Sequence, residues 1–170
     1  KPGPERQPAV TAEERQRARA VLDLQEGRGA VPILDDTAAG EVLRTARRIA
    51  IVGASPDPGR PSHSVMRYLI HHGYECVPVN PNARDVLGLP SFRTVVEAVA
   101  ETGPVDIVDV FRRSGLCLPH AEEAVAVGAG CLWLQLGVVD WAAARVAAAA
   151  GLGVVMDRCT AIEHRKLRGG

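Results

Sequence analysis

Short apolar runs alternate with longer amphipathic segments from residue 47 to the C-terminus. The apolar runs predict five strands, at 49–53, 75–79, 105–111, 131–135 and 154–156. Helices are expected between them, at 62–72, 92–101, 116–127 and 141–150, with a short one after the last strand. Strands that alternate with helices are typical of an α/β fold with a doubly wound parallel sheet. We expect the strand order 3-2-1-4-5, with a ligand at the carboxyl ends of strands one and four, where the winding reverses.

The segment before this alternating pattern is of a different kind. Residues 1–10 are polar and rich in proline, so we expect them to be disordered. Thr11 and Glu14 have the spacing of a capping box and predict a helix that ends near Gly27, and Asp35 can cap a second helix. The sequence therefore indicates a tail at 1–10, a helical extension at 11–46 and an α/β domain at 47–170.

The charge balance narrows the choice of partners. Twenty basic and twenty acidic side chains give a formal net charge of zero. This balance favours neither a nucleic-acid partner nor a membrane surface. No apolar stretch approaches the ~20 residues that span a bilayer, and the N-terminus has no signal-like apolar region. We expect a cytoplasmic protein with a small-molecule ligand.

The loop after the first strand is the strongest candidate for a ligand site. Gly53 lets the backbone come close to a ligand, and the following helix directs its N-terminal amides at an anion. The dinucleotide pattern G-x-G-x-x-G is incomplete, because Ser55 and Pro58 replace its second and third glycines. At the end of the second strand the chain has Val79-Asn80-Pro81 and no acid that could bind a free ribose diol. NAD is therefore disfavoured.

Basic side chains beside this loop favour a ligand with an extra phosphate. Arg60 lies in the loop and Arg84 follows the second strand, and both suit the phosphorylated ADP of NADP or coenzyme A. An ordinary α/β turn without a ligand remains the alternative. His63 is the one histidine in the loop and a candidate phosphate contact.

Other strand ends offer contacts but no catalytic pair. Phe111 and Arg112 follow the third strand, and Gln135 ends the fourth on the same face as Trp133, which we expect in the core. The four cysteines have no metal-ligand spacing, and neither a catalytic residue nor a metal site is predicted. Cys159 follows the last strand on the ligand side, and its reactivity stays open.

Five segments in register resemble the CoA-binding domain proteins. The segments are VGASPDPGRPSHSVMRYL, HGYECVPVNP, VDIVDVFR, CLWLQLGV and VVMDRCTAIEHRKL. The resemblance extends to the N-terminal domain of the succinyl-CoA synthetase α subunit and implies a Rossmann-like domain that binds coenzyme A. It implies that the first loop holds the diphosphate, that Val79 to Pro81 border the adenosine, and that Phe111, Arg112 and Gln135 line the path of the pantetheine arm. The candidate site residues are Gly53, Ala54, Ser55, Arg60, Ser62, His63, Ser64, Val79, Asn80, Pro81, Arg84, Phe111, Arg112 and Gln135.

Three functions follow from these features. The leading hypothesis is a protein that binds CoA or an acyl-CoA without catalysis of its own. The synthetase subunit carries a second domain with a phosphorylated histidine that this sequence does not extend into, so the alternative is the CoA-binding half of an acyl-CoA ligase or transferase with a separate partner. An NADP-dependent oxidoreductase is the third. A homodimer or an unidentified protein partner is left open.

Overall fold

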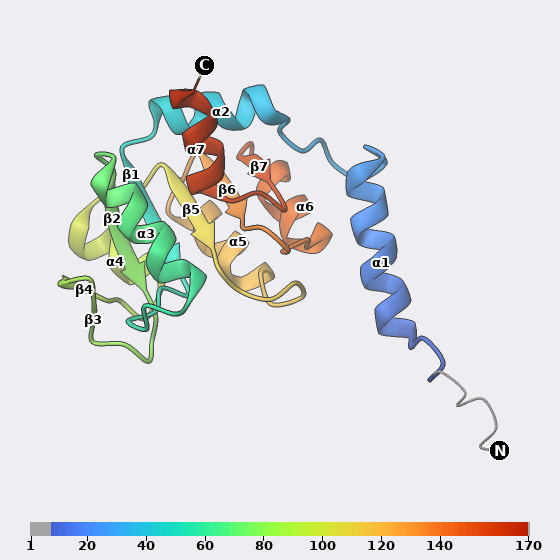
Figure 1. The fold of residues 1–170 in the computed structure, drawn as a ribbon, viewed down its shortest axis with the longest axis horizontal. Helices are drawn as coiled ribbons and strands as arrows, with labels where there is room; N and C mark the ends of the chain where they lie inside the picture. The colour runs from blue at the N-terminus through green and yellow to red at the C-terminus, as the bar shows by residue number, and fades with distance from the viewer. Residues whose placement is uncertain (1–7, 170) are drawn as a thin grey trace.

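The fold is that of a computed structural model, and residues 8–169 are described (Figure 1). Two helices precede the first strand, and five further helices alternate with or follow the strands. The elements are α1 (Ala12–Gln25), α2 (Asp36–Thr45), β1 (Arg48–Val52), α3 (Pro61–His71), β2 (Glu75–Val79), β3 (Asp85–Val86), β4 (Leu89–Pro90), α4 (Val95–Thr102), β5 (Ile107–Val110), α5 (Leu118–Ala126), β6 (Cys131–Leu134), α6 (Trp141–Ala149), β7 (Gly153–Val155) and α7 (Thr160–Arg168).

The predicted five-stranded parallel sheet is confirmed, but its predicted strand order is wrong. The order is β2-β1-β5-β6-β7, which is 2-1-3-4-5 when the parallel strands are numbered along the chain. The third strand therefore lies beside the first and not outside the second. A two-stranded sheet of β3 and β4, which the apolar pattern did not predict, follows β2.

Pro78 explains why β2 is an edge strand. A proline has no backbone N–H, and within sheets it is confined to edges and bulges. On the outer side of β2, the Pro78 carbonyl accepts a hydrogen bond from Phe92 N (3.1 Å) and Asn80 N donates to the Phe92 carbonyl (2.8 Å). The missing N–H thus faces the outer edge, where no full strand has to pair. The winding consequently reverses between β1 and β5, the first and third parallel strands, and not between the first and fourth as expected. Ligands of open α/β sheets bind at such a reversal.

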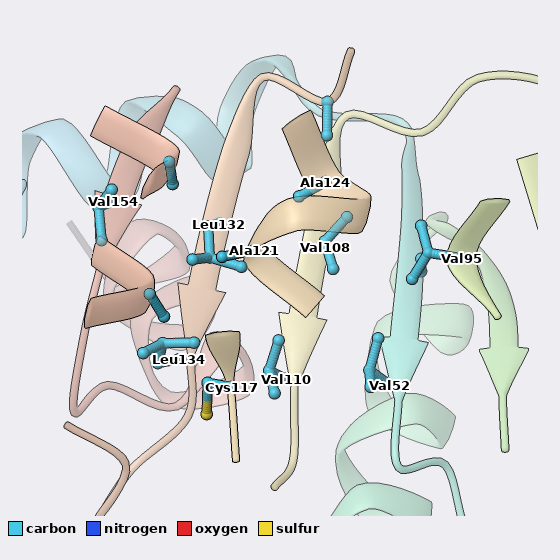
Figure 2. Close-up of a cluster of buried hydrophobic side chains, with 14 of the residues drawn as sticks. Val52, Val95, Val108, Val110, Cys117, Ala121, Ala124, Leu132, Leu134 and Val154 are labelled. Carbon is cyan, nitrogen blue, oxygen red and sulfur yellow. The ribbon is translucent and has the colours of Figure 1, made fainter. Parts of the chain in front are cut away.

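Helices cover both faces of the sheet, as the doubly wound fold requires. On one face, α4, α5 and α6 pack on valine and leucine side chains of the strands (Figure 2). On the other face, α2, α3 and α7 pack on Ile49, Ile51, Ile107 and Trp133. Trp133 is fully buried, which confirms its expected place in the core.

Both predicted helices of the N-terminal segment form. Thr11 and Glu14 make the reciprocal bonds of a capping box at α1, and the Asp35 side chain caps α2. No residue of α1 is buried, and in Figure 1 this helix lies to one side of the sheet. In contrast, α2 lies beside α7 and buries Leu43 in the core. The predicted disorder of the first ten residues falls mainly on residues 1–7, outside the described residues.

Among residues 8–169, no helix combines the length and the hydropathy needed to cross a membrane.

Candidate functional site

A cavity of about 640 Å³ opens at the carboxyl ends of β1, β5 and β6. It lies at the point where the winding reverses, which is where ligands of open α/β sheets bind. Its lining residues are Gly53, Ser55, Arg60, Pro61, Ser62, Val65, Asn80, Phe111, Arg112, Arg113, Gln135, Leu136, Gly137, Val138, Cys159 and Ile162.

Gly53 is required where β1 meets this cavity. Its φ is +81°, a conformation that side chains rarely adopt, and a Cβ there would lie 2.7 Å from the backbone oxygen of Phe111. The neighbouring strand ends thus approach each other at a distance that only glycine allows.

Hydrogen bonds within the loop between β1 and α3 fix its shape. Ser55 N donates to Ser62 Oγ (3.1 Å), and Asp57 N donates to Ser55 Oγ (3.1 Å). Gly59 N donates to Asp57 Oδ1 (2.9 Å). Within residues 8–169 no side chain caps α3, which has Pro61 in its first turn. The backbone amides at the N-terminus of this helix are therefore free to bind an anionic group of a ligand.

Three arginines and no acidic residue line the cavity among the described residues. Arg60 comes from the first loop, and Arg112 and Arg113 follow β5. None of the three forms an ion pair within residues 8–169. A protein without net charge thus concentrates positive charge at this one cavity, which suits a ligand with several phosphates.

Asp140 holds the loop that carries two of these arginines. Its Oδ2 accepts hydrogen bonds from Gly115 N (3.1 Å) and Cys117 N (3.2 Å), and its Oδ1 caps α6 through Ala143 N (3.1 Å). Ser114 Oγ also accepts from Val139 N (2.9 Å). The position of Arg112 and Arg113 therefore depends on the start of α6, which is distant in sequence.

The structure brings many of the predicted site residues together and places others elsewhere. The cavity gathers Gly53, Ser55, Arg60, Ser62, Asn80, Phe111, Arg112 and Gln135. Its lining does not include Ala54, His63, Ser64, Val79, Pro81 or Arg84.

The reasons for these absences differ. Val79 packs into the core on the α4 face of the sheet, and both Pro81 and Arg84 are exposed beyond β2. His63 is buried on α3, and its Nδ1 is the one buried side-chain nitrogen or oxygen without a hydrogen-bond partner among residues 8–169. Ala54 is buried in the core, and its carbonyl accepts from Asn80 Nδ2 (2.7 Å).

A buried polar network lies behind the cavity and was not predicted. Gln135 Nε2 donates to Asp109 Oδ1 (2.7 Å) and to Thr160 Oγ1 (2.9 Å), and Thr160 Oγ1 donates to Asp109 Oδ2 (3.1 Å). Burial raises the pKa of the Asp109 carboxyl to about 7, although the hydrogen bonds from Gln135 and Thr160 act in the opposite direction. A single acidic residue inside the apolar run of β5 is the sequence signal that could have revealed Asp109.

The cysteines fall into two kinds. Burial raises the pKa of the Cys76, Cys117 and Cys131 thiols to about 12, so these three are inert core residues. Cys159 is partly exposed and lines the cavity. No group of three or more potential metal ligands occurs in the part of the chain that the structure describes.

Comparisons with known proteins agree with this geometry. Residues 47–165 match the family model described as a CoA binding domain. The protein YneT of Bacillus subtilis (strain 168) is 39% identical over 124 residues, which cover 73% of this chain and 90% of YneT. A solved structure from Pyrococcus horikoshii OT3 is 37% identical with a TM-score of 0.75, covering 80% of this chain and 94% of that one. Another, from Thermus thermophilus, is 36% identical with a TM-score of 0.72 and covers 79% and 99%.

Proposed function

Because the chain belongs to the CoA-binding domain family, we propose that it binds coenzyme A or an acyl-CoA in the cavity at the carboxyl ends of β1, β5 and β6. The observation that carries the proposal is the set of three arginines that line this cavity, with no acidic residue beside them in the described part of the chain. Coenzyme A has a diphosphate and a 3′-phosphate, so it needs several cationic contacts within one site.

Two parts of the ligand have a matching region of the cavity. The diphosphate lies at the loop from Gly53 to Ser62, where the N-terminus of α3 and the close backbone approach favour an anion. The pantetheine arm runs past Phe111 toward Gln135 and the apolar side chains of Leu136 and Ile162. Binding is the proposed role, because the titratable side chains that line the cavity are arginines and one cysteine.

Isothermal titration with CoA and dephospho-CoA tests the proposal. If an arginine of the cavity reads the 3′-phosphate, dephospho-CoA binds roughly 10- to 100-fold more weakly, as expected for one lost charged hydrogen bond. Absence of binding to both ligands would contradict the proposal.

Single variants identify the arginine that reads the 3′-phosphate. We compare Arg60→Ala, Arg112→Ala and Arg113→Ala with Arg93→Ala, a control at an exposed arginine that does not line the cavity. The reading arginine is the one whose removal abolishes the preference for CoA over dephospho-CoA. Arg93→Ala leaves both affinities unchanged.

The same purified protein tests the two alternative functions, an NADP-dependent oxidoreductase and a half-site of an acyl-CoA enzyme. The arginines also suit the 2′-phosphate of NADPH, so NADPH is the competitor, and tighter binding of NADPH than of CoA would favour an oxidoreductase. Copurification of a second subunit with acyl-CoA ligase or transferase activity would favour the role of a CoA-binding half-site.

A further inference from the structure

Gln135 presents a hydrogen-bond acceptor to the cavity. The side chain is only 4% exposed, and both hydrogens of its amide are donated to Asp109 and Thr160. Among the described residues the side-chain hydrogen bonds of Gln135 all use its NH₂ group, so its carbonyl oxygen has no protein donor. This oxygen is not among the fully buried unpartnered atoms, so it keeps some accessible surface, and the residue lines the cavity. The unused acceptor of this amide, its carbonyl oxygen, is therefore available to a ligand in the cavity.

Asp109 fixes the orientation of the amide. An ionised carboxylate accepts hydrogen bonds but cannot donate them, so it admits only the NH₂ side of Gln135. The Thr160 hydroxyl accepts the other hydrogen of this NH₂ and donates its own to Asp109 (3.1 Å). All three side chains are at least nine-tenths buried, so water does not compete with these bonds. The network holds the amide in one of its two orientations.

The distance from the first loop indicates which part of the ligand meets this acceptor. Gln135 follows β6, which lies two strands from β1 in the sheet. Two strand spacings amount to about 10 Å, which is beyond the diphosphate at β1 but within reach of the pantetheine arm. Leu136, Val138 and Ile162 make the surroundings apolar, so an acceptor covered by ligand needs a donor from that ligand. The amide groups of pantetheine are such donors.

We infer that Asp109 is a positioning residue, which with Thr160 orients Gln135 to accept a hydrogen bond from an amide N–H of the pantetheine arm. This inference rests on the proposed function. It makes the cavity selective for the arm, independently of the phosphate contacts. It also assigns a binding role to a carboxylate that touches no ligand.

The test compares CoA with adenosine 3′,5′-bisphosphate, which retains phosphates but lacks the arm. Affinities are measured at pH 8, above the pKa of about 7 that burial gives Asp109, so that the ionised form predominates. Asp109→Asn admits the opposite amide orientation, and Gln135→Met removes the acceptor at similar length. Each lowers the affinity for CoA roughly 10-fold, as expected for a lost buried hydrogen bond, and leaves that for the bisphosphate unchanged. A structural defect would weaken both ligands.

A double variant provides the rescue. In Asp109→Asn with Gln135→Glu, the new amide donates to the new carboxylate, whose second oxygen again faces the cavity. CoA affinity then returns toward the wild-type value. Arg93→Ala, at an exposed position that does not line the cavity, serves as the control and leaves both affinities unchanged.

Acetyl-CoA separates the amide from the thiol as the donor. It keeps the amides of the arm but has no S–H, so its affinity falls in Asp109→Asn as much as that of CoA. Equal losses for CoA and the bisphosphate, no loss for CoA, or a loss for CoA but not for acetyl-CoA would each overturn the inference. A wild-type protein that binds no CoA would instead refute the proposed function.

Discussion

Replacing Gly53 by alanine tests the close approach between the ends of β1 and β5. The new Cβ would lie 2.7 Å from the Phe111 backbone oxygen, and the residue would keep a φ of +81°. Left-handed backbone costs a side-chain-bearing residue about 1–2 kcal/mol. An overlap that moves the backbone adds about 1–3 kcal/mol. We therefore expect Gly53→Ala to lower the free energy of unfolding by about 2–5 kcal/mol.

Gly151→Ala is the matched control for this variant. Gly151 has a nearly equal φ of +86°, but apart from its chain neighbours no atom of the described residues lies within 4 Å of the position of its Cβ. Both variants have the same kind of backbone strain and reduce the entropy of the unfolded chain in the same way. The difference between their free energies of unfolding therefore isolates the contact with Phe111. Gly151→Ala should cost only about 1–2 kcal/mol.

Urea and thermal unfolding measure both variants. For a chain of this length, each kcal/mol corresponds to about 2–4 °C in Tm. The displaced loop should also weaken CoA binding in Gly53→Ala but not in Gly151→Ala. Equal losses of stability in the two variants would refute the argument that the strand ends approach too closely for a side chain.

Further predictions concern the N-terminal segment, the buried acid and the exposed thiol. Leu43→Ala should lower the free energy of unfolding in urea by about 2–5 kcal/mol, because Leu43 is 1% exposed. Leu22→Ala on α1 should lower it by less than about 1 kcal/mol, because Leu22 is 47% exposed. Equal losses would contradict the burial of α2 in the core. Burial raises the pKa of Asp109 to about 7, so the folded state holds this proton more tightly than the unfolded state. The contribution of this proton to the free energy of unfolding is fully present below about pH 4 and is lost as the pH rises through about 7. The loss is at most roughly 1.4 kcal/mol per pH unit. The free energy of unfolding of Asp109→Asn, measured in urea, should lack this pH dependence. The same pH profile in the variant and the wild-type protein would contradict the prediction. Iodoacetamide should label Cys159 before the buried thiols, and bound CoA should slow the labelling, which mass spectrometry of digested protein measures.

Local signals predicted the helices and strands well. The capping residues Thr11 and Asp35 act on amides within three residues, so the starts of α1 and α2 could be read from the sequence. The apolar runs likewise marked all five strands of the main sheet, because a strand buried on both faces is apolar throughout.

The order of the strands was harder, because it depends on contacts between distant segments. Pro78 carried the relevant information, since it removes a donor that a central strand needs. Applied to the second strand, that rule would have excluded the order 3-2-1-4-5, in which this strand is flanked on both sides.

The cavity was only partly predictable for the same reason. Gly53, Ser55 and Arg60 belong to one loop, and its composition indicated a phosphate site. Arg113 lines the cavity from a segment that Asp140, in another loop, holds through Gly115 N and Cys117 N. Such a long-range hydrogen bond leaves no local pattern in the sequence.

The corrected strand order makes the phosphate site more compact than the sequence suggested. In the expected order, the third strand would end two strand spacings from the first, about 10 Å away. In the structure β5 pairs directly with β1, and Phe111 N donates to the Val52 carbonyl (2.9 Å). Arg112 and Arg113 therefore follow a strand about 5 Å from the loop that contains Gly53. Positive charge from β5 and the amides of α3 can then act on the same diphosphate, which neither element could bind as strongly alone.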